Sequence, residues 1–286
     1  MGLNELPIRW KELFCNNDIL RDTGISEYWK YVLMKMYSYS IKKKCTEILR
    51  WDIVNETIHL PNRFETNEWY KQLRNDADWE DRWEVVCRED EIGKPIKFEA
   101  DFKTSPTMVQ NAYHLMVLSK MANKRCLSYD IILEIGGGYG SFYKTIRNDG
   151  FIGKYYIYDI QPMVELQKAY LYDVANVDPS ILLDNIEFLS SVEQLEIEMQ
   201  GLKGKKILTV AFWSLSEMPI YIRQRIMRCL LELRNVDFFM SYQKQFLKYD
   251  NFSYFSQIDV WYKGLRNINR VEIPNHEGNY YIYFES

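Results

Sequence analysis

The segment from Ile131 to Ser141 constrains the fold of this chain more than any other. Four of its first five residues are apolar, which predicts a short strand buried on both faces. Glycines then break the strand, and the residues from Ser141 to Arg147 continue with helical spacing. A strand, a glycine turn and a helix in this order predict the ligand-binding end of a βαβ unit, because backbone without Cβ atoms can approach a ligand closely.

The spacing of the glycines distinguishes two kinds of nucleotide site. A dinucleotide-binding turn has the pattern G-x-G-x-x-G/A, but the third position is here Ser141. The pattern E-x-G-x-G-x-G is complete, and in it the segment resembles the class I S-adenosylmethionine (SAM) methyltransferases. This resemblance implies SAM as the cofactor, and the residues that it implies for cofactor binding are Glu134, Gly136, Gly137, Gly138 and Gly140.

Length and composition exclude several classes of protein. With 286 residues, 47% of them apolar, the chain can bury an α/β domain of roughly 150 to 200 residues and retain further material. The formal charge is -4 and no long basic block is present, so no nucleic-acid partner is expected. The five cysteines contain no C-x-x-C pair, which favours reduced thiols. No apolar run reaches the length of a membrane span, and we expect a cytoplasmic protein.

Residues 1–100 differ in character from the rest of the chain. Apolar positions between Ser26 and Arg50 recur at helical spacing, and Ser26 is a suitable N-cap, so a long amphipathic helix is predicted there. Tryptophans in a strongly charged setting follow. We expect a helical N-terminal region that covers the cofactor, holds an acceptor or forms a homo-oligomer contact. The SAM-binding domain is predicted over residues 101–286, and a helix that opens at Ser105 leads into its first strand.

Further strands are predicted beyond the glycine segment. They cover residues 155–159, 186–190, 207–213 and 236–242, and a closing hairpin covers 267–273 and 280–285. A parallel series that ends in an antiparallel hairpin is the order of the class I methyltransferases, whereas a dinucleotide domain is expected to continue with another parallel crossover. The predicted fold is therefore α/β: a Rossmann-like, doubly wound, seven-stranded sheet with a terminal antiparallel hairpin, plus the helical N-terminal region.

Ligands of open parallel sheets bind beyond the carboxyl ends of the strands, which directs attention to the residues that follow each strand. Asp159 ends the second predicted strand, 19 residues beyond Gly140, where a carboxylate can accept both ribose hydroxyls. Its alternative role is a helix cap. Ser190 follows the third strand, where adenine is expected to lie. Ile160 and Phe212 complete the predicted cofactor contacts.

The same edge is expected to hold the groups that act on an acceptor. Methyl transfer from a sulfonium depends mainly on alignment, and an alcohol nucleophile gains from a nearby base. His276 and Glu217 are the two candidate bases; alternatively, His276 is a structural group and Glu217 binds sugar hydroxyls or caps a helix. The candidate acceptor-binding residues are Ser216, Tyr242 and Gln243. No dense Asp/His cluster favours a metal, so no metal site is predicted.

Four longer strings carry a more particular resemblance. Ser105–His114, Leu133–Phe142, Asp159–Pro162 and Leu215–Pro219 resemble the sugar O-methyltransferases of bacterial surface-polysaccharide clusters. Within residues 100–286 this resemblance implies a sugar, nucleotide-sugar or glycan acceptor and methyl transfer to a hydroxyl. The alternatives are a methyltransferase acting on oxygen or nitrogen of another small molecule, a SAM-binding protein without turnover, and a nicotinamide-dependent oxidoreductase, which Ser141 and the hairpin disfavour.

Overall fold

The computed structural model describes residues 2–15, 18–59 and 64–286. Contacts within the chain divide it into two compact units. Unit 1 comprises Met1–Val117, Gly137–Ile152 and Ile160–Ile186, and unit 2 comprises Leu118–Gly136, Gly153–Asp159 and Glu187–Ser286. The glycine segment therefore contributes to both units, because the chain changes unit between Gly136 and Gly137.

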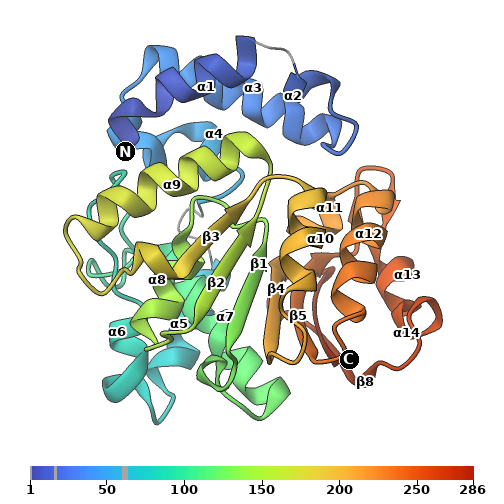
Figure 1. Ribbon diagram of the computed structural model, residues 1–286. Helices are drawn as coiled ribbons and strands as arrows, with labels where there is room; N and C mark the ends of the chain where they lie inside the picture. Colours follow the sequence, from blue (N-terminus) through green and yellow to red (C-terminus); the bar gives the residue numbers. More distant parts are fainter. Residues whose placement is uncertain (1, 16–17, 60–63) are drawn as a thin grey trace. The chain divides into compact units, whose positions relative to one another are not determined.

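Unit 2 is built on a seven-stranded sheet with the order β3-β2-β1-β4-β5-β9-β8 (Figure 1). Its strands are β1 (Ile131–Ile135), β2 (Lys154–Tyr158), β3 (Ile186–Leu189), β4 (Ile207–Phe212), β5 (Val236–Gln243), β8 (Arg266–Glu272) and β9 (Asn279–Glu285). β1 is parallel to β2 and β4, β4 is parallel to β5, and β9 is antiparallel to both of its neighbours. The predicted α/β fold, with a seven-stranded sheet that ends in an antiparallel hairpin, is confirmed.

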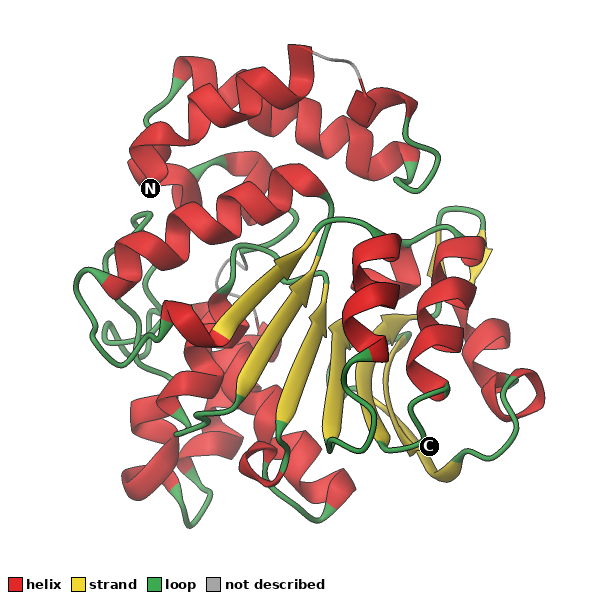
Figure 2. Ribbon diagram, in the orientation of Figure 1, coloured by secondary structure: helices red, strands yellow, loops and turns green. Residues whose placement is uncertain are grey.

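One face of the sheet packs against two helices of unit 2. They are α10 (Val192–Gln200) and α12 (Ile220–Leu231), drawn in red in front of β4 and β5 in Figure 2. Ile131, Leu133 and Ile135 of β1 lie in the same hydrophobic core as apolar residues of both helices. Because successive side chains of a strand point to opposite faces, Glu134 lies on the other face of the sheet.

Between β5 and β8 the chain forms short elements that the sequence did not predict. They are β6 (Gln245–Phe246), β7 (Tyr249–Asp250), α13 (Asn251–Ser256) and α14 (Ile258–Trp261). A further short helix, α11 (Ser214–Glu217), directly follows β4, and the 3-10 helix η4 (Cys126–Ser128) precedes β1. Each is too short to produce a periodic pattern in the sequence.

The described part of unit 1 is helical. Its elements are η1 (Leu3–Glu5), α1 (Leu6–Cys15), α2 (Asp18–Arg21), α3 (Glu27–Lys42), η2 (Cys45–Arg50), α4 (Asp52–Asn55), α5 (Phe64–Arg74), η3 (Trp79–Trp83), α6 (Glu84–Val86), α7 (Pro106–Ala122, which ends in unit 2), α8 (Ser141–Asn148), α9 (Gln161–Ala175) and η5 (Leu183–Asn185). Among the residues that the structure describes, no helix is both long and apolar enough to cross a membrane.

The two helix starts predicted in this region are confirmed. Ser26 precedes α3 and its side chain accepts a hydrogen bond from Trp29 N at 3.4 Å. Ser105 precedes α7 and its Oγ accepts one from Met108 N at 3.2 Å. The prediction of a helix through Arg50 was too long, because Lys43 adopts an extended backbone conformation and ends α3.

Buried ion pairs hold α8, the helix that follows the glycine segment. At its C-terminal end, Arg82 Nε lies 2.6 Å from Asp149 Oδ1. Within the helix, Lys144 Nζ lies 2.6 Å from Glu89 Oε1 and 2.7 Å from Asp90 Oδ2. Burial alone would lower the pKa of Lys144, but the two carboxylates outweigh it and the net shift is upward. Residues that precede position 100 thus neutralise charges of α8 inside unit 1.

Candidate functional site in unit 2

The carboxyl ends of β1, β2, β4 and β5 define one edge of the sheet in unit 2. Asn279, the first residue of β9, pairs with Gln243, the last residue of β5, so the turn between β8 and β9 lies at the same edge. We call this the carboxyl edge; its residues at or just beyond the strand ends are Gly136, Asp159, Trp213, Gln243 and Asn279. This is the edge at which sheets of this type bind ligands.

Gly136 brings the loops after β1 and β4 into direct contact. Its N–H donates to the carbonyl of Tyr158 at 2.8 Å, and its φ is +75°. A Cβ at this position would lie 2.2 Å from Ser214 Cβ and 2.7 Å from Ser214 Oγ. Ser214 is itself fixed, because its Oγ donates to the carbonyl of Ile135. Glycine is therefore required here both for its backbone conformation and for lack of space.

The other predicted glycines of the segment lie in unit 1. Gly140 precedes α8 and its N–H donates to the Gly137 carbonyl at 2.8 Å. The carbonyl of Gly138 accepts a hydrogen bond from Gln167 Nε2 at 3.1 Å. Ile160 is also in unit 1, where it is the N-cap residue of α9. Their predicted contacts with a cofactor remain predictions.

Two acidic residues lie on neighbouring parallel strands, Glu134 on β1 and Asp159 directly after β2. Glu134 is 3% exposed, and its Oε2 accepts a hydrogen bond from the Tyr155 hydroxyl at 2.9 Å. Burial raises the pKa of Glu134 to about 8; the Tyr155 hydrogen bond opposes this shift and the nearby Asp159 adds to it. Asp159 N–H donates to the carbonyl of Leu189 at 3.0 Å, which fixes Asp159 at the end of β2 as predicted. Such a pair suits a ligand with positive charge and hydroxyl donors.

Glu134 should make stability depend on pH. Its pKa is about 8 in the fold and 4.5 ordinarily, so between these values the unfolded chain loses the proton that the folded chain keeps. The contribution of Glu134 to stability is therefore present at low pH and is lost as pH rises to about 8. Since Glu134→Gln lacks this ionisation, its stability relative to wild type should increase from about pH 5 to pH 8 in urea unfolding. The exposed Glu198→Gln is the control, and curves parallel to wild type for Glu134→Gln would contradict the assignment.

Trp213 occupies a strained position just beyond β4. Its backbone has φ +60° and ψ -30°, a conformation that bulky side chains rarely adopt. Two hydrogen bonds hold it: its N–H donates to Ser241 O at 2.8 Å, and its indole Nε1 donates to Asn279 Oδ1 at 2.7 Å. The indole centroid lies 5.9 Å from that of His276. The sequence did not identify Trp213 or Asn279 as site residues.

Three predicted residues are brought together at the ends of β4 and β5. Ser216 Oγ donates to Gln243 Oε1 at 2.7 Å, and Gln243 Nε2 donates to Glu217 Oε1 at 3.3 Å. Ser216 is 1% exposed, so the hydrogen bond that orients the Gln243 side chain comes from a buried hydroxyl. Gln243 and Glu217 are both partly exposed.

A buried arginine that the sequence analysis did not identify fixes the loop that carries these residues. Arg223 of α12 is fully buried and donates to the carbonyls of Ser216 and Met218, the latter at 2.7 Å. A third hydrogen bond runs from Arg223 Nη1 to Asn251 Oδ1 at 2.6 Å. Burial lowers the pKa of Arg223 to about 10, which leaves it charged at neutral pH. Arg223 of α12 thereby ties α11 to the start of α13.

Ser190 and Phe212 lie at the predicted strand ends. The backbone N–H and hydroxyl of Ser190 both donate to Gln194 Oε1, at 2.8 and 3.2 Å. Ser190 therefore also stabilises the start of α10. Phe212 is partly exposed at the end of β4, and its ring centroid is 6.0 Å from that of Phe239.

Tyr242 lies in the core. Its side chain is 1% exposed, and its ring centroid is 4.6 Å from that of Phe255 and 5.5 Å from that of Tyr280. Because side chains alternate along β5, Tyr242 shares the core face with Phe238 and Met240. We therefore do not include Tyr242 among the residues proposed below for acceptor binding.

Comparisons with known proteins find distant structural likeness. No protein-family model matches the chain, and no curated protein matches its sequence. The methyltransferase domain of bacterial CtHen1 is 12% identical with a TM-score of 0.47, covering 62% of this chain and 97% of that one. A SAM-dependent methyltransferase from Aquifex aeolicus is 14% identical with a TM-score of 0.42, covering 78% of this chain and 98% of that one. The mitomycin 7-O-methyltransferase MmcR is 10% identical with a TM-score of 0.39, covering 91% of this chain and 68% of that one. These likenesses are too distant to assign a function.

Proposed function

We propose that this protein is a SAM-dependent methyltransferase. The observation that carries the proposal is the pair of acids on neighbouring strands, Glu134 and Asp159, next to the bare backbone of Gly136. SAM has a sulfonium, an ammonium group and ribose hydroxyls, and buried carboxyl groups favour such positive charges and hydroxyl donors. A nicotinamide dinucleotide is disfavoured because Ser141 replaces the third glycine of its pattern and because the sheet ends in an antiparallel hairpin.

The residues of unit 2 have distinct roles in this proposal. Asp159 accepts the ribose hydroxyls, and Gly136 allows close approach of the ligand to backbone. Glu134 is mostly protonated at neutral pH without ligand, and a bound positive charge lowers its pKa so that the carboxylate can balance that charge. Ser190 and Phe212 contact the adenine of SAM in this proposal. In unit 1, the proposed contacts are those predicted from the sequence, at Gly137, Gly138, Gly140 and Ile160. When bound, SAM supplies an electrophilic methyl group on a positively charged sulfur.

The proposed acceptor is a sugar hydroxyl, in a free sugar, a nucleotide sugar or a glycan. A flat indole and polar side chains suit a saccharide, because the ring packs on the sugar face while amide and carboxylate groups bond to its hydroxyls. Trp213 and Gln243 supply these groups, with Glu217 beside Gln243. His276 is the proposed base that takes the hydroxyl proton. A small molecule methylated at another oxygen or at nitrogen is the alternative acceptor.

The biological setting is proposed from the sequence. The strings at Ser105–His114 and Leu215–Pro219 resemble sugar O-methyltransferases, which supports a role in bacterial surface-polysaccharide biosynthesis. Residues 1–100 are proposed to cover the cofactor, hold the acceptor or form a homo-oligomer contact. Formation of S-adenosylhomocysteine in the presence of candidate nucleotide sugars and glycans, against matched non-sugar alcohols, tests the acceptor class.

Asp159→Ala should weaken SAM binding by about 1.5 to 3 kcal/mol, because charged hydrogen bonds to ribose are lost. This corresponds to a dissociation constant roughly 10 to 150 times higher in calorimetry. The exposed carboxylate Asp184 provides the control, and Asp184→Ala should bind SAM as wild type does. Unchanged affinity in Asp159→Ala would remove this residue from the site, and a wild-type protein that bound NAD and not SAM would refute the proposed function.

A further inference from the structure

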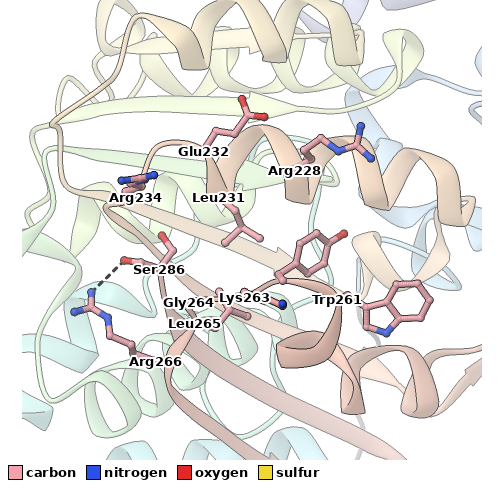
Figure 3. Close-up of a pocket in the computed structure, with 11 residues that line it drawn as sticks. Arg228, Leu231, Glu232, Arg234, Trp261, Lys263, Gly264, Leu265, Arg266 and Ser286 are labelled. Atoms are coloured by element: carbon pink, nitrogen blue, oxygen red, sulfur yellow. Dashed lines mark hydrogen bonds between the residues drawn. The ribbon is translucent and has the colours of Figure 1, made fainter.

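A concave surface of unit 2 lies at the opposite end of β5 from the carboxyl edge. It is a groove of about 680 Å³ lined by the end of α12, the turn before β5, the segment between α14 and β8, and the end of the described chain (Figure 3). β5 separates it from the carboxyl edge, and eight residues of strand span roughly 25 Å. We call it the basic groove, defined by Arg228, Arg234, Trp261, Tyr262, Lys263 and Arg266.

The groove carries a surplus of positive charge in a chain whose formal charge is -4. Four of its lining residues are cations, against the single acidic side chain of Glu232. Within the described residues, the side chains of Arg228, Arg234 and Lys263 take part in no ion pair or hydrogen bond. Arg266 donates to the Ser286 carbonyl at 3.1 Å. Three cations are thus available to an anionic ligand.

Aromatic rings lie among these cations. Trp261 is 53% exposed, which is uncommon for so large an apolar ring. The ring of Tyr262 lines the groove together with Arg228. Figure 3 shows Arg234 and Arg266 at one end of the groove and Arg228 with Trp261 at the other. The groove therefore offers charged donors at both ends and a flat ring at one of them.

We propose that the basic groove binds an acidic glycan chain, with sugar rings against the aromatic side chains and carboxylate or phosphate groups on the cations. Guanidinium groups bind such anions through paired hydrogen bonds, and exposed indoles pack on sugar faces. Cations at both ends favour an extended ligand with repeated charges over a compact ligand with one.

This inference rests on the proposed saccharide acceptor and deepens it. A chain held in the groove is about 25 Å from the groups that act on it, so the groove is a second attachment point and not the place of methyl transfer. Attachment there would raise the local concentration of acceptor at the carboxyl edge.

The experiment measures calorimetric binding of a polygalacturonate oligosaccharide to the full chain, with neutral maltohexaose as the uncharged probe and glucose 1-phosphate as the compact one. Wild type should bind polygalacturonate with an affinity that falls as salt rises, and should bind the other two at least about tenfold more weakly. The double variant Arg228→Gln, Lys263→Gln and the variant Trp261→Ala should each lose at least about tenfold for polygalacturonate. Exposed lysines elsewhere in unit 2 give the control, Lys203→Gln with Lys205→Gln, which should bind as wild type does.

Equal binding of all three probes, or full affinity in the groove variants, would overturn the proposal. SAM binding measured on the same samples separates the two hypotheses. Groove variants that lose polygalacturonate should keep wild-type SAM affinity and unfolding midpoint. Loss of the groove result with SAM binding intact would reject the groove alone, whereas absence of SAM binding to wild type would reject the proposed function.

Discussion

His276→Ala is expected to lower turnover by about 100-fold or more while SAM affinity stays unchanged. A neutral sugar hydroxyl is a weak nucleophile, and a base that removes its proton contributes typically 10²–10⁴-fold to the rate. His276 lies in the turn between β8 and β9, next to the indole of Trp213 and at the carboxyl edge. Single-turnover formation of S-adenosylhomocysteine, together with calorimetry of SAM binding, measures the two effects separately.

Glu217 provides the matched variant for this prediction. Its carboxylate accepts a hydrogen bond from Gln243, so Glu217→Gln should raise KM for the acceptor more than it lowers kcat. If Glu217→Gln loses turnover and His276→Ala keeps it, then Glu217 is the base and His276 is structural. Trp213→Phe keeps an aromatic ring but removes the hydrogen bond to Asn279. Its turnover therefore shows how much is lost when the hairpin turn is displaced while the His276 side chain is still present.

Gly136→Ala is expected to destabilise the fold by roughly 2 to 5 kcal/mol and to abolish SAM binding. The new methyl group would lie 2.2 Å from Ser214 Cβ, and the φ of +75° is strained for alanine. Ser214 cannot easily move, because its hydroxyl donates a hydrogen bond to the Ile135 carbonyl. Urea unfolding and SAM calorimetry measure the two losses.

Gly138→Ala separates the backbone effect from the steric effect. Gly138 also has a positive φ, +55°, but the nearest atom to an added Cβ is Ile58 Cβ at 3.7 Å. This variant should therefore lose only about 1 to 2 kcal/mol. Gly136→Ala combined with Ser214→Gly should recover the difference between the two. Equal losses for Gly136→Ala and Gly138→Ala would show that contact with Ser214 is not what requires glycine.

The sheet could be predicted because each strand has its own pattern of apolar residues in consecutive positions of the sequence. β1 is a run of buried apolar residues bounded by glycine, and the bounds of the predicted strands agree with the structure to within one residue. The closing hairpin could be predicted for the same reason, since its two alternating runs flank a turn. Glu134 and Asp159 followed from this register, because a strand end fixes the position of its next residue.

Trp213 and Asn279 could not be predicted in the same way, because their geometry depends on contacts distant in sequence. The hydrogen bond from Trp213 to Asn279 joins residues 66 positions apart, and a positive φ at a tryptophan runs against its conformational preference. The place of Tyr242 at a strand end does not reveal which face of the sheet its side chain occupies, and in the structure that side chain lies in the core. Arg223 has no motif, and its role depends on carbonyl groups of another element.

The ion pairs of α8 have a consequence for how this chain can be divided. The sequence changes character near residue 100, yet the charged partners of Asp149 and Lys144 are Arg82, Glu89 and Asp90, all before that point. A chain that began at residue 101 would keep the charges of α8 and lose what neutralises them, and an unpaired buried charge costs about 3 to 5 kcal/mol. The residues before position 100 and α8 after the glycine segment must therefore change together. A chimera that replaced only one of the two would leave buried charges without partners.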